Sequence, residues 1–159
     1  MATPMDTNLK LLSDESSELV DMTRYRQIIG SMMYMTNSRP YICFVVNTLS
    51  QYLVKPRRVH LIVAKHVMRY IKEAMDFRIY YGRYHDYILY RYTDSDWAGS
   101  ATDRKSTSGG CYCQGSAMTS WFSKKQSNVS LSTTEVEYIV VCSASCEAIW
   151  LPKIDVRTI

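Results

Sequence analysis

The chain has 159 residues, of which 47% are hydrophobic and 21% charged, a composition of globular rather than disordered proteins. No apolar run reaches the roughly 18 residues that a membrane-spanning helix needs, which argues against an integral membrane protein. The acidic N-terminus also lacks the basic start and the apolar core of a secretory signal. We therefore expect a cytoplasmic or nuclear protein with no membrane partner.

The net charge of +4 is unevenly distributed along the chain. Residues 1–23 carry one lysine against five acidic residues, whereas residues 24–91 carry twelve lysines and arginines against three acidic residues. A basic middle segment is typical of a surface that meets nucleic acid, although solvated helix faces produce the same pattern. Both interpretations stay open on charge alone.

The first half of the chain predicts a leader and three helices. Residues 1–22 show no hydrophobic periodicity and are predicted to form a flexible acidic leader. Apolar residues three to four apart then predict helices over about 23–36, 41–53 and 59–74, the first capped by Asp21 or Thr23. Together they form a predicted helical domain, residues 23–76. We expect inward-facing side chains at Tyr25, Ile28, Ile29, Met32, Met33, Thr36, Ile42, Val45, Val46, Leu49, Leu53, Leu61, Ala64, Val67, Met68 and Ile71. His60 and His66 lie off this stripe and are predicted to be surface or boundary residues.

The second half changes to the period of two that is typical of strands. Strands are predicted at 77–81, 87–93, 109–114 and 118–122, with turns at 82–86 and around Gly115. Ser132 and Glu135 have the spacing of a capping box, which begins a helix predicted over about 133–153 and interrupted near its end by Pro152. Three helices, a small antiparallel sheet and one long helix predict an α+β fold, with residues 77–159 as its second domain.

Eight short segments carry a family resemblance. In chain order they are YRQIIGSMMY at 25–34, SRPYI at 38–42, HLIVAKHVMRYIK at 60–72, YTDSDWAGS at 92–100, DRKSTSG at 103–109, WFSKKQ at 121–126, STTEVEY at 132–138 and AIWL at 148–151. In this order and spacing they resemble the C-terminal part of copia-type (Ty1/copia, Pseudoviridae) retrotransposon Pol polyproteins. Tyr41 and Leu61 depart from the aspartate and tryptophan of the family pattern.

The resemblance implies that residues 23–76 are the connection or thumb-like segment of a reverse transcriptase. Residues 77–159 would then be a truncated RNase H-like domain. The paired aspartates of the polymerase palm, in a YVDD-like signature, are absent from the sequence. We therefore expect no reverse transcriptase activity from this chain.

The resemblance also implies two ancestral catalytic and metal-binding carboxylates, Asp94 on the opening strand and Glu137 in the last helix. Asp96 shares a strand face with Asp94, but the family pattern favours Asp94. Cleavage by two metal ions needs more oxygen ligands than two carboxylates supply. The family's third aspartate would follow in a CDNxxA-like segment that the sequence does not contain. We therefore expect no enzyme activity, and Mg²⁺ only if the site were completed. Ordinary polar roles in a turn and a helix N-terminus stay open for these acids.

Two further functions are open alternatives. Fragments similar to this one are also known as secreted RxLR-type effectors that act inside host cells and suppress plant cell death, although the sequence contains no Arg-x-Leu-Arg. A nucleic-acid-binding module is the other alternative, through the basic residues Arg57, Arg58, Lys65, Arg69 and Lys72. We also expect a protein partner at an uncovered sheet edge, with Trp97, Trp121, Tyr112 and Phe122 exposed.

Overall fold

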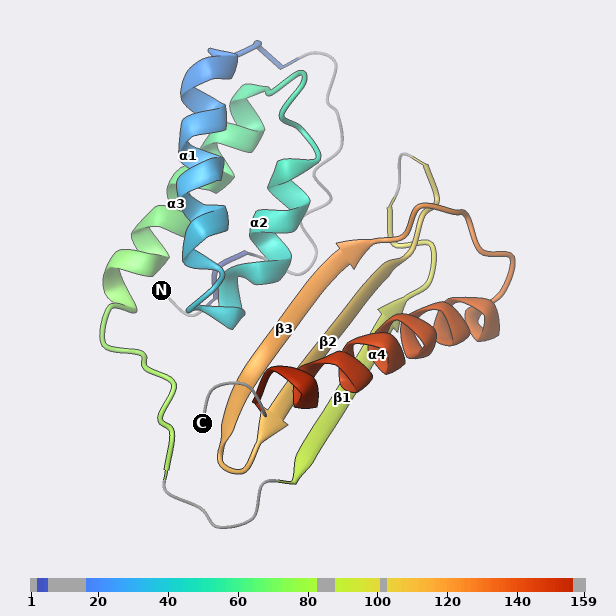
Figure 1. Ribbon diagram of the computed structural model, residues 1–159. Helices are drawn as coiled ribbons and strands as arrows, with labels where there is room; N and C mark the ends of the chain where they lie inside the picture. Colours follow the sequence, from blue (N-terminus) through green and yellow to red (C-terminus); the bar gives the residue numbers. More distant parts are fainter. Residues whose placement is uncertain (1–2, 6–16, 83–87, 101–102, 156–159) are drawn as a thin grey trace. The chain divides into compact units, whose positions relative to one another are not determined.

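The computed structural model describes residues 3–5, 17–82, 88–100 and 103–155, with the backbone alone for residues 151–155. The chain divides into two compact units, Met1–Ile79 and Tyr80–Ile159 (Figure 1). Most of the predicted leader, the predicted turn at 82–86 apart from Gly82, and Tyr87 lie outside the described residues. Within the described residues, no helix is both long enough and apolar enough to cross a membrane.

The helical unit contains the three predicted helices. They are α1 (Met22–Met35), α2 (Cys43–Ser50) and α3 (Arg58–Glu73), and a short 3₁₀ turn, η1 (Pro40–Ile42), leads into α2. Asp21 caps α1, because its side chain accepts hydrogen bonds from the backbone N–H groups of Thr23 and Arg24. The second helix, α2, is shorter at both ends than the predicted 41–53. The 3₁₀ turn takes up its expected start, and the helix ends at Ser50.

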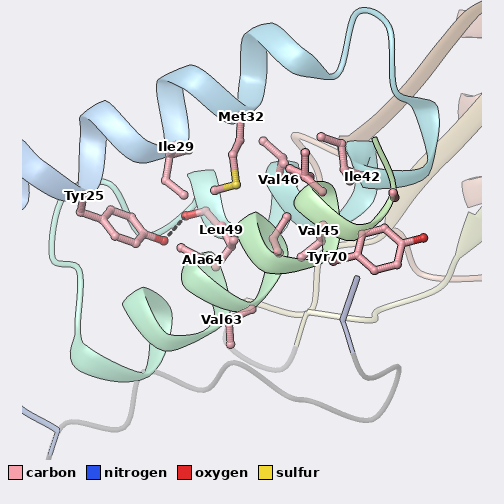
Figure 2. Close-up of a cluster of buried hydrophobic side chains, with 13 residues drawn as sticks. Tyr25, Ile29, Met32, Ile42, Val45, Val46, Leu49, Val63, Ala64 and Tyr70 are labelled. Carbon is pink, nitrogen blue, oxygen red and sulfur yellow. Dashed lines mark hydrogen bonds between the residues drawn. The ribbon is translucent and has the colours of Figure 1, made fainter. Parts of the chain in front are cut away.

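A single apolar cluster holds the three helices together (Figure 2). The Tyr25 hydroxyl donates a hydrogen bond of 2.9 Å to the carbonyl oxygen of Leu49, and burial together with nearby Tyr52 raises the pKa of Tyr25. Most of the predicted inward side chains are confirmed, but Met33 and Met68 are about half exposed. The buried members are Tyr25, Ile29, Met32, Ile42, Val45, Val46, Leu49, Val63, Ala64, Val67, Tyr70, Ile71 and Ala74.

His60 is a correction to the sequence prediction. It is 1% exposed, its ring stacks on Tyr52 with centroids 3.8 Å apart, and its Nδ1 accepts a hydrogen bond from the backbone N–H of Arg57. The stripe of α3 is therefore rotated toward Val63 and Tyr70, away from Met68. A polar ring can be buried here because it caps the first turn of the helix. His66, predicted as surface or boundary, is half-buried.

The end of the predicted leader is also a correction. Residues 17–20 run antiparallel to residues 56–58 rather than remaining free. The backbone N–H of Val20 donates to Pro56, the backbone N–H of Arg58 donates to Glu18, and an isolated bridge joins Leu19 to Arg57. These bonds fix the chain where it enters α1.

The second unit is a three-stranded antiparallel sheet with one helix on it, which confirms the α+β prediction. Its strands are β1 (Leu89–Asp96), β2 (Thr107–Gln114) and β3 (Ala117–Lys125), in the order β1-β2-β3. Gly115, with φ 58°, makes the tight turn between β2 and β3. The predicted strand at 77–81 does not form. Phe77 instead packs edge-on against Tyr41 in the helical unit.

The long helix α4 (Thr133–Asp155) lies across β1 and β2 (Figure 1). Val136, Val140 and Ala144, four residues apart, are buried toward the sheet, and the Tyr112 hydroxyl donates to the Ala144 carbonyl at 2.7 Å. Tyr112 is thus buried, which makes its predicted exposure wrong. Trp121 and Phe122 are half-buried, and the exposure of Trp97 is confirmed.

The start and end of α4 differ in detail from the prediction. The Glu135 N–H donates to the Ser132 hydroxyl as predicted, whereas the Glu135 carboxylate accepts from Leu131 N–H. The helix continues past Pro152 to Asp155.

Candidate functional site

The faces of β1 are set by two contacts with α4. Arg91 donates to the Ser145 hydroxyl at 3.2 Å, and Tyr112, the register partner of Arg91, reaches Ala144. Because side chains alternate along a strand, Arg91, Thr93 and Ser95 lie on the face that α4 covers. Asp94 therefore lies on the opposite, uncovered face.

Asp94 and Asp96 share that uncovered face, and both are exposed. Asp94 stands opposite Gly109 in the sheet, and its carboxylate accepts a hydrogen bond from the N–H of Ser95 at 2.9 Å. The Asp96 carboxylate instead folds onto the loop that follows β1. A Cβ atom at Gly99 would lie 1.7 Å from its Oδ2, so a larger residue there would displace the Asp96 carboxylate. Asp94 is consequently the freer of the two acids.

Glu137 lies beside the outer edge of β1. It is exposed, and it stands two turns before Ser145, in the row of α4 that also contains Val141. The helix runs antiparallel to β1, since Val136 lies near the end of the strand that contains Ser95 and Ala144 near Arg91. Glu137 and Asp94 thus come to the same end of β1, but on different sides of the sheet.

A polar network joins the start of α4 to the sheet, and sequence reasoning missed it. The Gln126 side-chain amide donates to the Ser108 hydroxyl at 2.9 Å and to the Val136 carbonyl at 3.4 Å, while Ser130 donates to the amide oxygen at 3.3 Å. Gln126 and Ser130 are both buried. These residues position the first turns of α4, and with them Glu137.

An ion pair lies at the end of β3, two strands across the sheet from Asp96. Lys125 on β3 pairs in register with Thr107 on β2, and Thr107 pairs with Asp96 on β1. The ammonium group of Lys125 contacts the Asp103 carboxylate at 2.8 Å and the Ser100 hydroxyl at 2.9 Å. Partial burial alone would raise the pKa of Asp103. The hydrogen bonds from Lys125, Ser100 and the Lys105 backbone outweigh it and lower that pKa to about 2.

The oxygen donors at this end of β1 are therefore few. The part of the chain that the structure describes contains no group of three or more His, Cys, Asp or Glu side chains placed to hold a metal ion. Of the two carboxylates predicted for the site, Asp94 lies on the uncovered face of β1 and Glu137 lies on α4. A pair of Mg²⁺ ions needs near-octahedral oxygen coordination for each ion, which these two residues do not supply.

The predicted basic residues separate into two groups. Arg58, Lys65, Arg69 and Lys72 are exposed, and their spacing of seven, four and three places them along one side of α3. We call these four residues the α3 basic stripe. It extends about 21 Å along the helix, at 1.5 Å per residue. Arg57 is half-buried and donates to the Ser17 carbonyl, so it serves the fold rather than this stripe.

Comparison with known proteins gives several relatives. The chain is 40% identical over 95% of its length to the Retrovirus-related Pol polyprotein from transposon RE2 of Arabidopsis thaliana, of which it spans 10%. It is 34% identical over 96% of its length to the Pol polyprotein from transposon TNT 1-94 of Nicotiana tabacum, of which it spans 12%. It is also 38% identical over 84% of its length to the Secreted RxLR effector protein 161 of Plasmopara viticola, of which it covers 95%. No family model matches, and no solved structure does.

Proposed function

Because this chain belongs to the copia-type Pol polyprotein family, we propose that its second unit is an RNase H-like domain that does not cleave nucleic acid by itself. The chain spans about a tenth of the length of the Pol polyproteins it matches, so the activities of the whole polyproteins are not carried over to it. The observation that carries the proposal is the donor set at the end of β1. Asp94 lies on the uncovered face of the sheet together with Asp96, Glu137 lies on α4, and the described residues contain no group of three or more His, Cys, Asp or Glu side chains placed to hold a metal ion.

The missing donors have a chemical consequence. In cleavage by two metal ions, one ion activates the attacking water and the other stabilises the leaving oxygen, with the ions about 3.5–4 Å apart. Carboxylates must bridge and flank the pair to hold it against the repulsion of two dications. Lys125 and Asp103 do not add to the donor set, since they neutralise each other in an ion pair. The chain itself thus supplies a fold related to the nuclease but not the ligand number.

The test is a cleavage assay on a labelled RNA–DNA hybrid in Mg²⁺ and in Mn²⁺. We expect no fragments from the purified chain and none from the Asp94→Asn variant. Weak cleavage that is equal in both proteins would point to a contaminating nuclease. Cleavage by the natural chain that Asp94→Asn abolishes would contradict the proposal.

A second candidate function rests on the α3 basic stripe. Four exposed cations along about 21 Å of one helix side match the spacing of several phosphates on one duplex strand, and each phosphate contact releases counterions. We expect binding to duplex nucleic acid without base specificity, weakening as salt rises. In fluorescence anisotropy, Lys65→Glu with Arg69→Glu should weaken binding at least tenfold, whereas Lys55→Glu, outside the stripe, should change it little. An affinity that does not vary with salt would refute this function.

The third candidate rests on the similarity to the Secreted RxLR effector protein 161, which the chain covers almost completely. If this chain acts as a similar effector, expression inside leaf cells should suppress cell death triggered by a co-expressed elicitor. Val46→Asp, which places a charge in the helical core, is the matched control for a folded state. If the natural chain suppresses cell death no more than the Val46→Asp variant does, the effector hypothesis is refuted.

A further inference from the structure

β1 and β3 are the two edge strands of the sheet, and they differ in how their outer edges are protected. β1 ends the strand order, and among the described residues no strand pairs with its outer side. β3, the other edge, ends in the lysine pair Lys124 and Lys125 and has a register irregularity in its pairing with β2, features that protect edges. β1 pairs with β2 in continuous register and contains neither lysine nor proline.

We propose that this edge of β1 pairs antiparallel with the same edge of a second copy of the chain, which makes one continuous sheet from two. The proposal goes beyond the function above and does not depend on it. Its first support is that the sheet unit leaves many large apolar side chains exposed and buries few. Few apolar side chains are fully buried there, whereas Tyr90, Tyr92, Tyr138 and Val141 are between 43% and 73% exposed near the β1 edge or on α4.

Charge limits the registers that such a pair can adopt. Residues directly opposite in an antiparallel pair point to the same face, so odd-numbered residues of β1 meet odd-numbered ones and even meet even. A pair centred on Arg91 sets two arginines opposite each other, and one centred on Asp94 sets two aspartates opposite each other. Like charges directly opposite are destabilising. Pairs centred on Tyr92 and on Thr93 both keep like charges from facing each other. The Thr93-centred pair sets Tyr92 opposite Asp94 and Tyr90 opposite Asp96.

Of these two registers, the covering helices favour the one centred on Thr93. α4 lies over β1 and β2, and strands are about 4.8 Å apart, so a two-fold axis at the β1 edge brings the two α4 helices to about 10 Å. That is the separation of packed helices. Four residues of helix and two of strand both advance about 6 Å, so Val141, one turn before Ser145, lies beside Thr93. The two Val141 side chains would therefore meet at the axis.

The matched variants Tyr92→Glu and Tyr92→Lys test the register. Tyr92 is 62% exposed, so neither change disturbs the core of one chain. Light scattering after gel filtration, on the full chain at tens of micromolar, should give twice the 18.4 kDa of one chain for the natural protein and for Tyr92→Lys. Tyr92→Glu faces Asp94 with a like charge and should give the single-chain mass, as should Val141→Asp.

Amide hydrogen exchange of the natural chain tests the same pairing without relying on a variant that could misfold. In the natural chain, protection of the β1 amides should rise with protein concentration, while protection of the β2 amides stays constant. A natural chain that keeps the single-chain mass, with β1 protection independent of concentration, would overturn the proposal and leave the edge to a strand of another protein. Equal dimerisation of Tyr92→Glu and Tyr92→Lys would also overturn it, because the interface would then lie elsewhere.

Discussion

His60 shows how one residue can combine a cap, an aromatic contact and a stability cost. Its Nδ1 accepts from the backbone N–H of Arg57, so the remaining proton lies on Nε2, which is buried and has no hydrogen-bond partner among the residues that the structure describes. Sequence periodicity placed His60 outside the core because it lies off the apolar stripe of the helix. The helix-capping contact and the stack on Tyr52 reverse that preference, and neither can be seen in a spacing of apolar residues.

This burial predicts that acid destabilises the helical unit. Burial, and secondarily the charge of Arg57, lower the pKa of His60 below 6.5, so the unfolded chain binds a proton more readily than the folded one. Stability is therefore fully present above pH 6.5 and falls as the pH drops from 6.5 toward the folded pKa. Urea unfolding followed by circular dichroism at pH 7.5 and 5.5 measures this loss. His60→Gln should reduce the difference between the two values, and His66→Gln should not.

Tyr112 links the sheet to α4 through one buried hydroxyl. Tyr112→Phe removes its hydrogen bond to Ala144 and keeps the ring, so we expect a loss of about 1 kcal/mol in the free energy of unfolding. Tyr92→Phe, at an exposed position, is the control and should change stability by less than the error of a denaturation curve. A null result at Tyr112 would mean that the hydroxyl finds an equivalent partner in water.

At the scale of elements, periodicity predicted helices and the β2–β3 hairpin well, because their apolar faces are packed within one unit. The predicted strand at 77–81 failed for the opposite reason. Its tyrosines and isoleucine suit a strand, but a strand needs a neighbour, and Phe77 contacts Tyr41 of the helical unit instead. The length of α4 beyond Pro152 was also unpredictable from local preference, which places a boundary at proline.

The first helix gives a test of a single capping residue. The sequence left Asp21 and Thr23 as alternatives, and the structure assigns the cap to Asp21, which accepts from Thr23 N–H at 2.9 Å. Asp21→Ala should lower the free energy of unfolding by about 1 kcal/mol. Thr23→Ala keeps the backbone N–H of residue 23, which donates to the Asp21 carboxylate, and should therefore have a much smaller effect. Equal losses in the two variants, measured by urea denaturation, would show that the cap is not the source.

At the scale of the whole molecule, the order of the predicted helices and strands gave the α+β fold, since each element is a local pattern of apolar residues. The candidate site was predictable only as a list of residues. Asp94 and Glu137 were identified from the family resemblance, but their placement on different sides of β1 depends on the pleat of the strand and on the rotation of α4. Gln126, which fixes that rotation, gave no signal of its own because a buried glutamine is recognised only by its partners.

The two units differ in how much of their core is self-contained, and this predicts how each behaves alone. All thirteen buried apolar residues of the helical cluster lie between Tyr25 and Ala74, and residues 17–20 are tied to 56–58. A fragment of residues 17–79 should therefore keep its helical circular dichroism and unfold cooperatively. A fragment of residues 80–159 buries fewer apolar side chains and should unfold at lower denaturant, with a midpoint that rises with concentration if β1 edges pair. A noncooperative 17–79 fragment would show that its cluster needs residues outside this range, such as Met5, which packs against the cluster.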